Sequence, residues 1–295
     1  MSEEPTRPDR NESQRLLEIR MGKVKHKIAV ISGKGGVGKS VVTVNLAAAF
    51  AHRSDIATVG ILDADIHGPC VPKMLGMKGQ RLQVGPPGIF PAVGPQGLRV
   101  VSMDFLLQSD EVPVIWRGPL KMAAIRQFLS EIVWGDLDCL FIDLPPGTGD
   151  EALSVTQLLP DLDGVIIVTI PSEVSRDVVK KAVTFARTVG APIIGVIENM
   201  SGFICPACGA AFPIFGAGGG AAIASEMDVP FLGAIPIDPQ ISEDADKGVP
   251  FILERRDTRV AKAFDAIVDH VATFLTREST LQKAEARVRR PEASE

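Results

Sequence analysis

A glycine-rich stretch near the start of the chain constrains the fold more than any other feature. Residues 33–40 read GKGGVGKS and match the pattern G-x-x-x-x-G-K-S/T. They follow an apolar run, KIAVIS, that is typical of a buried strand, and they precede VVTVNLAAAFAHR, which is typical of a helix. Between a strand and a helix this pattern binds the phosphates of a nucleoside triphosphate. The sequence therefore predicts a P-loop.

The residue types of this loop suit phosphate chemistry. Glycines let the backbone curl so that successive N–H groups face a polyphosphate, and the N-terminus of the following helix adds to the attraction. We expect the Lys39 ammonium to reach the β- and γ-phosphates and the Ser40 hydroxyl to ligate Mg²⁺. The predicted nucleotide-binding stretch comprises Gly33, Lys34, Gly35, Gly36, Val37, Gly38, Lys39, Ser40 and Val41.

The remaining strand candidates are continuous apolar runs that alternate with helical segments. Such runs are typical of strands covered on both faces, which predicts an α/β fold with a doubly wound, mostly parallel sheet flanked by helices. Ligands of such folds bind outside the carboxyl ends of the strands. We expect a single P-loop ATPase domain over residues 25–276, a polar flexible N-terminal extension over 1–24, and a charged flexible tail over 277–295.

The composition narrows the class of protein. The chain has 295 residues and a formal net charge of −5, which argues against a general nucleic-acid coat. No apolar run approaches the roughly 18 residues of a membrane span, and the first residues lack the apolar core of a secretory signal. We therefore expect a cytoplasmic protein that acts on neither nucleic acid nor membrane.

Carboxylates follow two further strand candidates. Asp63 and Asp65 end the run ATVGILDAD, where a loop would reach the γ-phosphate. Asp143 follows the apolar run CLFI, the setting of a Walker B aspartate that supports Mg²⁺, through water. The next residues, LPPGTGD, offer the backbone N–H of Gly147 as a sensor of the γ-phosphate. An aspartate at a strand end is also a common cap or turn residue, which is the alternative for each.

The segment CPACG contains a C-x-x-C pair, Cys205 and Cys208. Two thiolates are half of the four ligands that zinc and iron–sulfur clusters usually take. Cys139 lies in an apolar strand and Cys70 near the nucleotide loop, so neither completes the set. A second copy of the chain would do so in a two-fold dimer. A bridging 4Fe–4S cluster, a structural zinc ion and a thiol–disulfide couple all remain open.

Six motifs in order carry a close resemblance: SGKGGVGKS, DADIHGPCVPKMLG, DLPPGTGDE, ENMSGFICPACG, IFGAGGG and IPIDP. Over residues 25–275 the chain resembles the Mrp/ApbC family of iron–sulfur cluster carriers, which are deviant Walker A ATPases of the MinD and nitrogenase-iron-protein class. The resemblance implies a homodimer that binds and slowly hydrolyses ATP. It also implies a labile 4Fe–4S cluster held between the subunits, received from assembly scaffolds and passed to apo-proteins.

The resemblance also implies residue roles. Lys34 would reach the nucleotide of the partner subunit, and Asp65 would position the attacking water, so that Lys34, Lys39 and Asp65 form the catalytic set. Asp63 would lie in the outer shell of the metal. Asn199 would bond the adenine base, with Pro236 and Asp238 on the base's other side. Family members often carry Ser in place of Cys70 and an aromatic residue in place of Gly202.

Two other functions compete with this interpretation. A partitioning or positioning ATPase of the ParA/MinD type needs a basic surface or an amphipathic C-terminal anchor, and the tail ARVRRPEASE has no apolar face. A zinc-bridged dimeric nucleotide-binding regulator fits the same cysteine pair. Metal analysis after anaerobic purification distinguishes zinc from iron.

Overall fold

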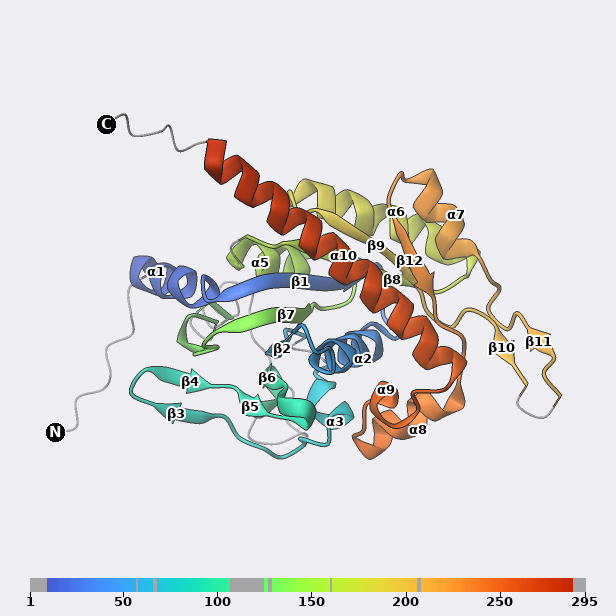
Figure 1. Cartoon of the computed structure of the whole chain (residues 1–295), viewed down its shortest axis with the longest axis horizontal. Coiled ribbons are helices and arrows are strands. Elements are labelled where there is room, and N and C mark those ends of the chain that lie inside the picture. Colours follow the sequence, from blue (N-terminus) through green and yellow to red (C-terminus); the bar gives the residue numbers. More distant parts are fainter. Residues whose placement is uncertain are drawn as a thin grey trace.

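A single large sheet organises the molecule (Figure 1). The computed structural model describes residues 10–56, 58–65, 68–106, 125–126, 129–159, 161–205 and 208–288. Within these ranges the sheet has eight strands in the order β12-β9-β8-β1-β7-β2-β6-β5. All neighbours pair in parallel except β5, which is antiparallel to β6 at the edge. The predicted fold class is confirmed.

The elements alternate along the chain as the sequence predicts. The sheet strands are β1 (Val24–Ser32), β2 (Val59–Asp63), β5 (Ala92–Val93), β6 (Arg99–Ser102), β7 (Leu137–Asp143), β8 (Gly164–Thr169), β9 (Ile193–Glu198) and β12 (Phe231–Ala234). Two hairpins stand apart, β3 (Gln83–Gly85) with β4 (Gly88–Phe90), and β10 (Phe203–Ile204) with β11 (Ala211–Phe212). The helices are α1 (Arg10–Met21), α2 (Lys39–Ala51), α3 (Val71–Met74), α5 (Asp150–Leu158), α6 (Glu173–Thr188), α7 (Gly219–Glu226), α8 (Pro239–Lys247), α9 (Phe251–Glu254) and α10 (Arg259–Val288).

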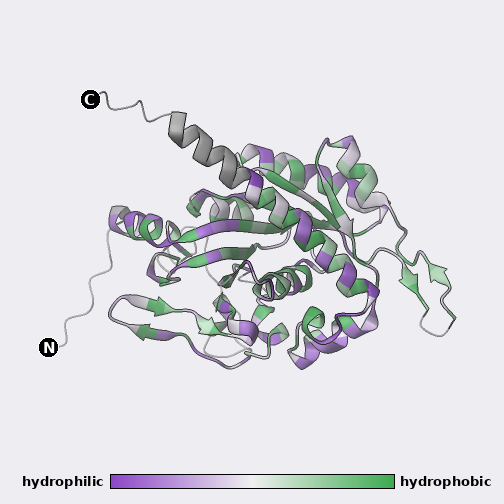
Figure 2. Ribbon diagram, in the orientation of Figure 1, coloured by the Kyte–Doolittle hydropathy of each residue, from purple (hydrophilic) through white to green (hydrophobic). Residues whose placement is uncertain are grey.

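Helices cover both faces of the sheet, and the central strand β1 contributes to both cores. Ile28 and Val30 face the layer that contains α2, α9 and α10, whereas Ala29 and Ile31 face the layer that contains α1, α5 and α6. All four side chains are buried, because successive residues of a strand point to opposite faces. Figure 2 shows the resulting apolar centre of the sheet.

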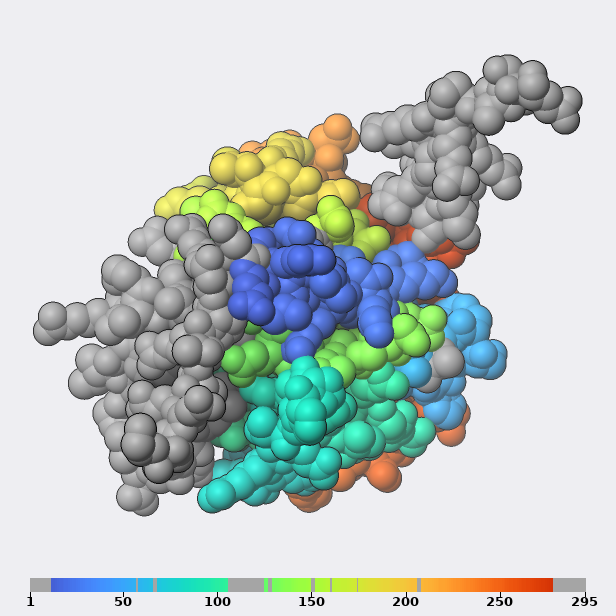
Figure 3. Space-filling view, turned by 90° about the vertical axis from the view of Figure 1, so that its left-hand side faces the viewer, coloured from blue at the N-terminus to red at the C-terminus, as the bar shows by residue number. Residues whose placement is uncertain are grey.

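The N-terminal segment differs from the expectation. Residues 10–21 form α1, and Leu17 and Met21 of this helix are fully buried against the second core. Figure 3 shows the N-terminal segment (dark blue) on the surface of the body, with the yellow α6 region above it and the turquoise β3–β4 hairpin below it. The prediction of a flexible extension over residues 1–24 is therefore wrong for residues 10–24, because apolar side chains four residues apart bury one helical face. Residues 1–9 lie outside the described ranges.

The C-terminal segment also differs. Helix α10 extends to Val288, so residues 277–288 are helical and do not form a loose tail. Residues 289–295 lie outside the described ranges. None of the helices in the described part of the chain combines the length and apolar character that a membrane crossing requires.

The register of the central strands positions the functional residues. Asp63 at the end of β2 and Asp143 at the end of β7 are register partners, and Val30 of β1 also pairs with Asp143. The carboxyl ends of β1, β2 and β7 therefore meet at one edge of the sheet, directly below the glycine-rich loop that follows β1.

Candidate functional site

The glycine-rich loop surrounds a cavity of about 250 Å³. Gly36 and Gly38 have φ angles of 78° and 80°, a left-handed conformation that other residues rarely adopt. The cavity is lined by loop residues and by the segments that follow β2 and β7, namely Ser32, Gly35, Gly36, Val37, Gly38, Lys39, Ser40, Val41, Asp65, Gly68, Cys70, Met74 and Pro146. The predicted phosphate loop and its strand-to-helix setting are present.

Gly33 has a different reason to be glycine. It does not line the cavity, and a Cβ atom at this position would overlap the side chain and backbone of Val178 in α6. The structure therefore assigns Gly33 to close packing between the loop and α6, although the motif alone suggested phosphate contact.

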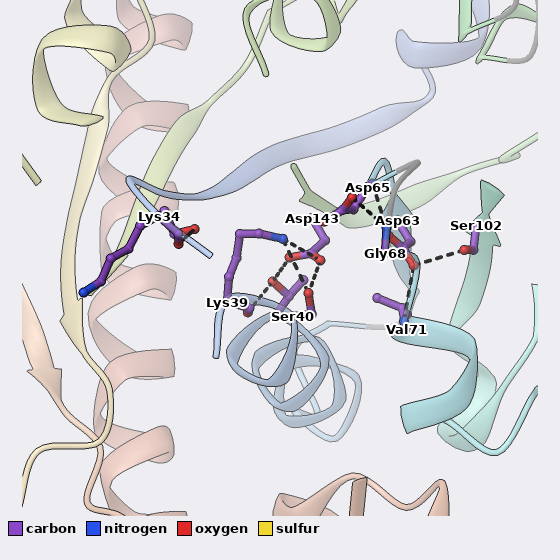
Figure 4. A network of polar contacts seen from close by, with 11 residues as sticks. Lys34, Lys39, Ser40, Asp63, Asp65, Gly68, Val71, Ser102 and Asp143 are labelled. Carbon is purple, nitrogen blue, oxygen red and sulfur yellow. Dashed lines mark hydrogen bonds and ion pairs between the residues drawn. The ribbon is translucent and has the colours of Figure 1, made fainter. Parts of the chain in front are cut away.

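Asp143 is the centre of the polar network shown in Figure 4. The Lys39 ammonium lies 2.8 Å from Asp143 Oδ2, and the Ser40 hydroxyl donates to the same oxygen at 2.5 Å. Thr43 donates to the other oxygen, Oδ1, at 2.8 Å. Lys39 and Asp143 are 6% and 0% exposed, so this ion pair is screened little by solvent. The structure thus brings Asp143 together with Lys39 and Ser40 of the loop.

Asp63 holds the loop that follows β2. Its carboxylate accepts hydrogen bonds from Val71 N at 3.2 Å, Ser102 Oγ at 3.0 Å and Asp65 N at 3.3 Å. Burial raises the pKa of Asp63 to about 8, and the nearby charge of Asp143 acts in the same direction. Asp65 lines the cavity, and its Oδ1 accepts a hydrogen bond from Gly68 N at 3.1 Å. Asp63 thus orders the loop that follows β2, whereas Asp65 faces the nucleotide cavity.

Two of the expected phosphate contacts have other orientations here. The Gly147 N–H donates to the Ser32 carbonyl at 2.8 Å, so a γ-phosphate would have to compete with that bond. Figure 4 shows the Lys34 side chain directed away from Lys39 and Asp143. The Lys34 ammonium therefore does not join Lys39 and Asp143, although the Lys34 backbone carbonyl accepts a hydrogen bond from Ser32 Oγ at 3.0 Å. The direction of the side chain suits a contact outside this cavity.

The expected base-binding residues lie together. Asn199 is buried, and its side-chain amide donates to the Val37 carbonyl of the phosphate loop at 2.9 Å. The segment containing Pro236 is joined to the loop after Asn199 by a bond from Ile237 N to Gly202 O of 2.8 Å. The Asp238 carboxylate caps α8 by accepting from Gln240 N at 3.0 Å. Asp238 therefore has a structural role that the resemblance did not indicate.

The C-x-x-C pair lies on the β10–β11 hairpin, which we call the cysteine hairpin. It projects from the body next to β12 (Figure 1). Cys205 is half-buried, Cys208 is exposed, and they are not joined in a disulfide. Among the described residues, no third His, Cys, Asp or Glu joins them in a metal-binding group. One chain thus offers two thiols, which is half of the four ligands that zinc and iron–sulfur clusters usually take.

The other two cysteines are elsewhere. Cys139 is buried in β7, as the sequence predicts. Cys70 lines the nucleotide cavity, and burial raises the pKa of its thiol to about 11. Cys70 therefore lies at the nucleotide cavity and not on the cysteine hairpin, and its burial favours the protonated thiol.

The comparisons with known proteins agree with this geometry. The family model described as the ParA family, NUBPL iron-transfer P-loop NTPase, matches residues 23–272. The chain belongs to this family. It is 54% identical to the iron-sulfur cluster carrier protein of Saccharolobus solfataricus over 255 residues, 86% of each chain. It is also 54% identical to the protein of that name from Methanocaldococcus jannaschii over 251 residues, 85% of each chain.

A solved structure shares the fold of this chain. The nucleotide-binding protein from Archaeoglobus fulgidus, in complex with ADP, is 37% identical and superposes with a TM-score of 0.73. The match covers 85% of the present chain and 96% of the other. The expected family is confirmed, and the fold of the chain is that of a P-loop NTPase.

Two functional residues were missed by the sequence analysis. Thr43 and Ser102 donate to Asp143 and Asp63, the two aspartates below the loop. The signal for Thr43 was present, since one turn after the P-loop lysine a hydroxyl lies on the same helical face. Ser102 ends β6 beside the end of β2, and only the register of these strands brings it to Asp63.

Proposed function

We propose that this protein is an ATP-dependent carrier of iron–sulfur clusters. The observation that carries the proposal is the joining of two sites in one chain. Asn199 bonds the phosphate loop, and Cys205 follows six residues later on the cysteine hairpin. The membership in an iron-transfer NTPase family and the relatives named cluster carriers support iron as the cargo.

The nucleotide site has the groups that Mg-ATP requires. Lys39 would neutralise the β- and γ-phosphates, and the Ser40 hydroxyl with the Asp143 carboxylate would hold Mg²⁺, which prefers oxygen ligands. An ion held there would offset the negative charge that develops on the phosphates. Asp65 lines the same cavity and would orient the attacking water. Lys34, which points away from its own site, would contribute its charge to the partner's nucleotide.

Two chains would together hold the cluster. Each cysteine hairpin supplies Cys205 and Cys208, so two copies related by a two-fold axis supply the four thiolates of a 4Fe–4S cluster. The hairpin surface suits such a contact, because Phe212, Ile214 and Phe215 are 50%, 56% and 48% exposed. The cluster would then be passed to apo-proteins, and nucleotide turnover would regulate that transfer.

Anaerobic reconstitution with iron and sulfide tests the cargo. We expect about two irons and two sulfides per chain, a dimer by light scattering, and background iron in the double variant Cys205→Ala, Cys208→Ala. Cys70→Ala is the matched control, because it removes a thiol outside the hairpin and should leave the iron content unchanged. Equal iron in the double variant and the wild type would contradict the carrier role, and stoichiometric zinc in the protein as purified would favour a structural zinc site.

Phosphate release tests the enzyme. We expect slow, Mg²⁺-dependent hydrolysis of ATP that is lost in Lys39→Ala. Lys34→Ala should retain ADP binding and lose hydrolysis, because its charge acts on the partner's nucleotide. Full hydrolysis by Lys34→Ala would contradict that assignment.

A further inference from the structure

A buried carboxylate lies between the nucleotide loop and the cysteine hairpin and is not used by either site. Glu198 ends β9 and is fully buried. Its Oε1 accepts from Ser201 Oγ at 2.5 Å and from Gly218 N at 2.9 Å, and its Oε2 accepts from Gly220 N. All three donors are neutral, so the hydrogen bonds and the adjacent N-terminus of α7 compensate the buried charge.

The positions of these donors in the chain give the carboxylate its significance. Ser201 precedes β10, whereas Gly218 and Gly220 follow β11. Both ends of the segment that carries Cys205 and Cys208 therefore meet at one side chain. The main chain reinforces this junction, because Ser201 N donates to Ile235 O at 2.9 Å in the segment after β12.

The other side of the junction is the nucleotide loop. Residue 199, directly after this glutamate, donates its side-chain amide to the Val37 carbonyl at 2.9 Å. The close fit is visible at Gly38, where a Cβ atom would overlap the Asn199 amide. A displacement of the phosphate loop would therefore act directly on Asn199, which follows Glu198, the residue that bonds both ends of the hairpin segment.

We propose that Glu198 is a positioning residue that fixes the two cysteines relative to the nucleotide loop. The inference rests on the proposed carrier function. Glutamate is required because both oxygens must accept hydrogen bonds. Glutamine would turn an amide N–H toward at least one of the donors, leaving a buried donor without an acceptor.

Hydrogen–deuterium exchange tests this positioning role of Glu198 in protein that carries no cluster. In Glu198→Gln we expect exchange of the amides of residues 203–205 and 208–216 to rise about tenfold or more, because a hydrogen-bonded buried charge is lost. Amides of α2 should keep their wild-type rates. Glu226→Gln is the matched control, since that carboxylate on α7 makes exposed ion pairs with Arg176 and Lys180.

Iron release distinguishes positioning from general support of the fold. After reconstitution, release to a chelator is measured with and without Mg-ATP, and the ratio of the two rates is compared. We expect the ratio to fall to about one in Glu198→Gln, while the Kd for ADP stays within about twofold of wild type. Ser201→Ala, which removes one donor and leaves the charge, should give a smaller change in the same direction.

The outcomes separate the two proposals. Unchanged hairpin exchange in both Glu198→Gln and Ser201→Ala overturns the positioning role, whatever the iron content. If the wild type binds no iron but the exchange effect is present, the carrier function is contradicted and the positioning role of Glu198 is supported. If Glu198→Gln does not fold, Ser201→Ala decides by exchange, and wild-type protection of the hairpin in that variant overturns the inference.

Discussion

The hydroxyl of Thr43 provides the sharpest test of the network below the phosphate loop. Thr43 is fully buried in α2, and its Oγ1 lies 2.8 Å from Asp143 Oδ1 and 3.0 Å from the Lys39 carbonyl. A hydroxyl has one proton, and the shorter distance places it on the carboxylate. Thr43→Val keeps the shape of the side chain and removes this donor.

The expected cost follows from the charge of the acceptor. A hydrogen bond to a charged group contributes roughly 1.5–3 kcal/mol, against about 1 kcal/mol for a neutral pair. Thr156 is a matched control, because it is also buried in a helix and its hydroxyl donates to neutral carbonyls, those of Ala152 and Leu153. We expect Thr43→Val to lower the free energy of unfolding by about 2–3 kcal/mol and Thr156→Val by about 1 kcal/mol.

The effect on the nucleotide is measured by calorimetry with ADP. Asp143 loses the bond that orients it toward Ser40, so we expect Mg-ADP to bind about tenfold more weakly in Thr43→Val, which corresponds to about 1.4 kcal/mol. Binding of ADP without Mg²⁺ should change much less. Equal destabilisation of the two Thr variants, together with wild-type Mg-ADP affinity, would refute the argument.

Three further predictions follow from burial. Denaturant titration should show that Leu17→Ala lowers the free energy of unfolding by about 2–5 kcal/mol. Ile19→Ala, on the exposed face of α1, should change it little. Equal losses of unfolding free energy in the two variants would contradict the packing of α1 against the core. Burial raises the pKa of Asp63 from an ordinary 3.8 to about 8, so between these pH values the folded state binds a proton that the unfolded state does not. The free energy of unfolding should therefore fall as pH rises from 4 to 8, and it should fall less steeply in Asp63→Asn. Parallel pH profiles of the two proteins would contradict this. Because the pKa of Cys70 is about 11, its alkylation at pH 7.5 should be much slower than that of Cys208, and saturating ADP should slow it further; rapid alkylation by mass spectrometry would be the contrary result.

Sequence patterns predicted the nucleotide site where a motif fixes local geometry. Lys39, Ser40 and Asp143 lie together because the loop, the helix N-terminus and the end of β7 share one sheet edge in any fold of this kind. The pattern did not distinguish Gly33 from the other loop glycines. Gly33 must be glycine because it packs against α6, a helix that begins 140 residues later. Contacts between residues so far apart leave no local signal in the sequence.

The predictions for the two terminal segments were wrong for a different physical reason. The N-terminal segment is strongly polar, and this average concealed Leu17 and Met21 at helical spacing. The C-terminal residues are good helix formers, so α10 continues well past Leu275, a buried apolar residue of this helix. In both segments composition predicted flexibility, whereas periodicity and helix propensity decided the structure.

Asp143 suggests how nucleotide binding would change the site without a large rearrangement. Its Oδ2 is shared by the Lys39 ammonium and the Ser40 hydroxyl, the two groups that a Mg-nucleotide would claim through its phosphates and its metal ion. Its Oδ1 is held by Thr43, which no phosphate group needs. If a Mg-nucleotide took Lys39 and Ser40 as partners, the bond from Thr43 would keep the Asp143 carboxylate in place and leave Oδ2 available to support the ion. A single hydroxyl would thus preserve the geometry of the metal site while its other partners exchange, which is why its removal should weaken binding with Mg²⁺ far more than without it.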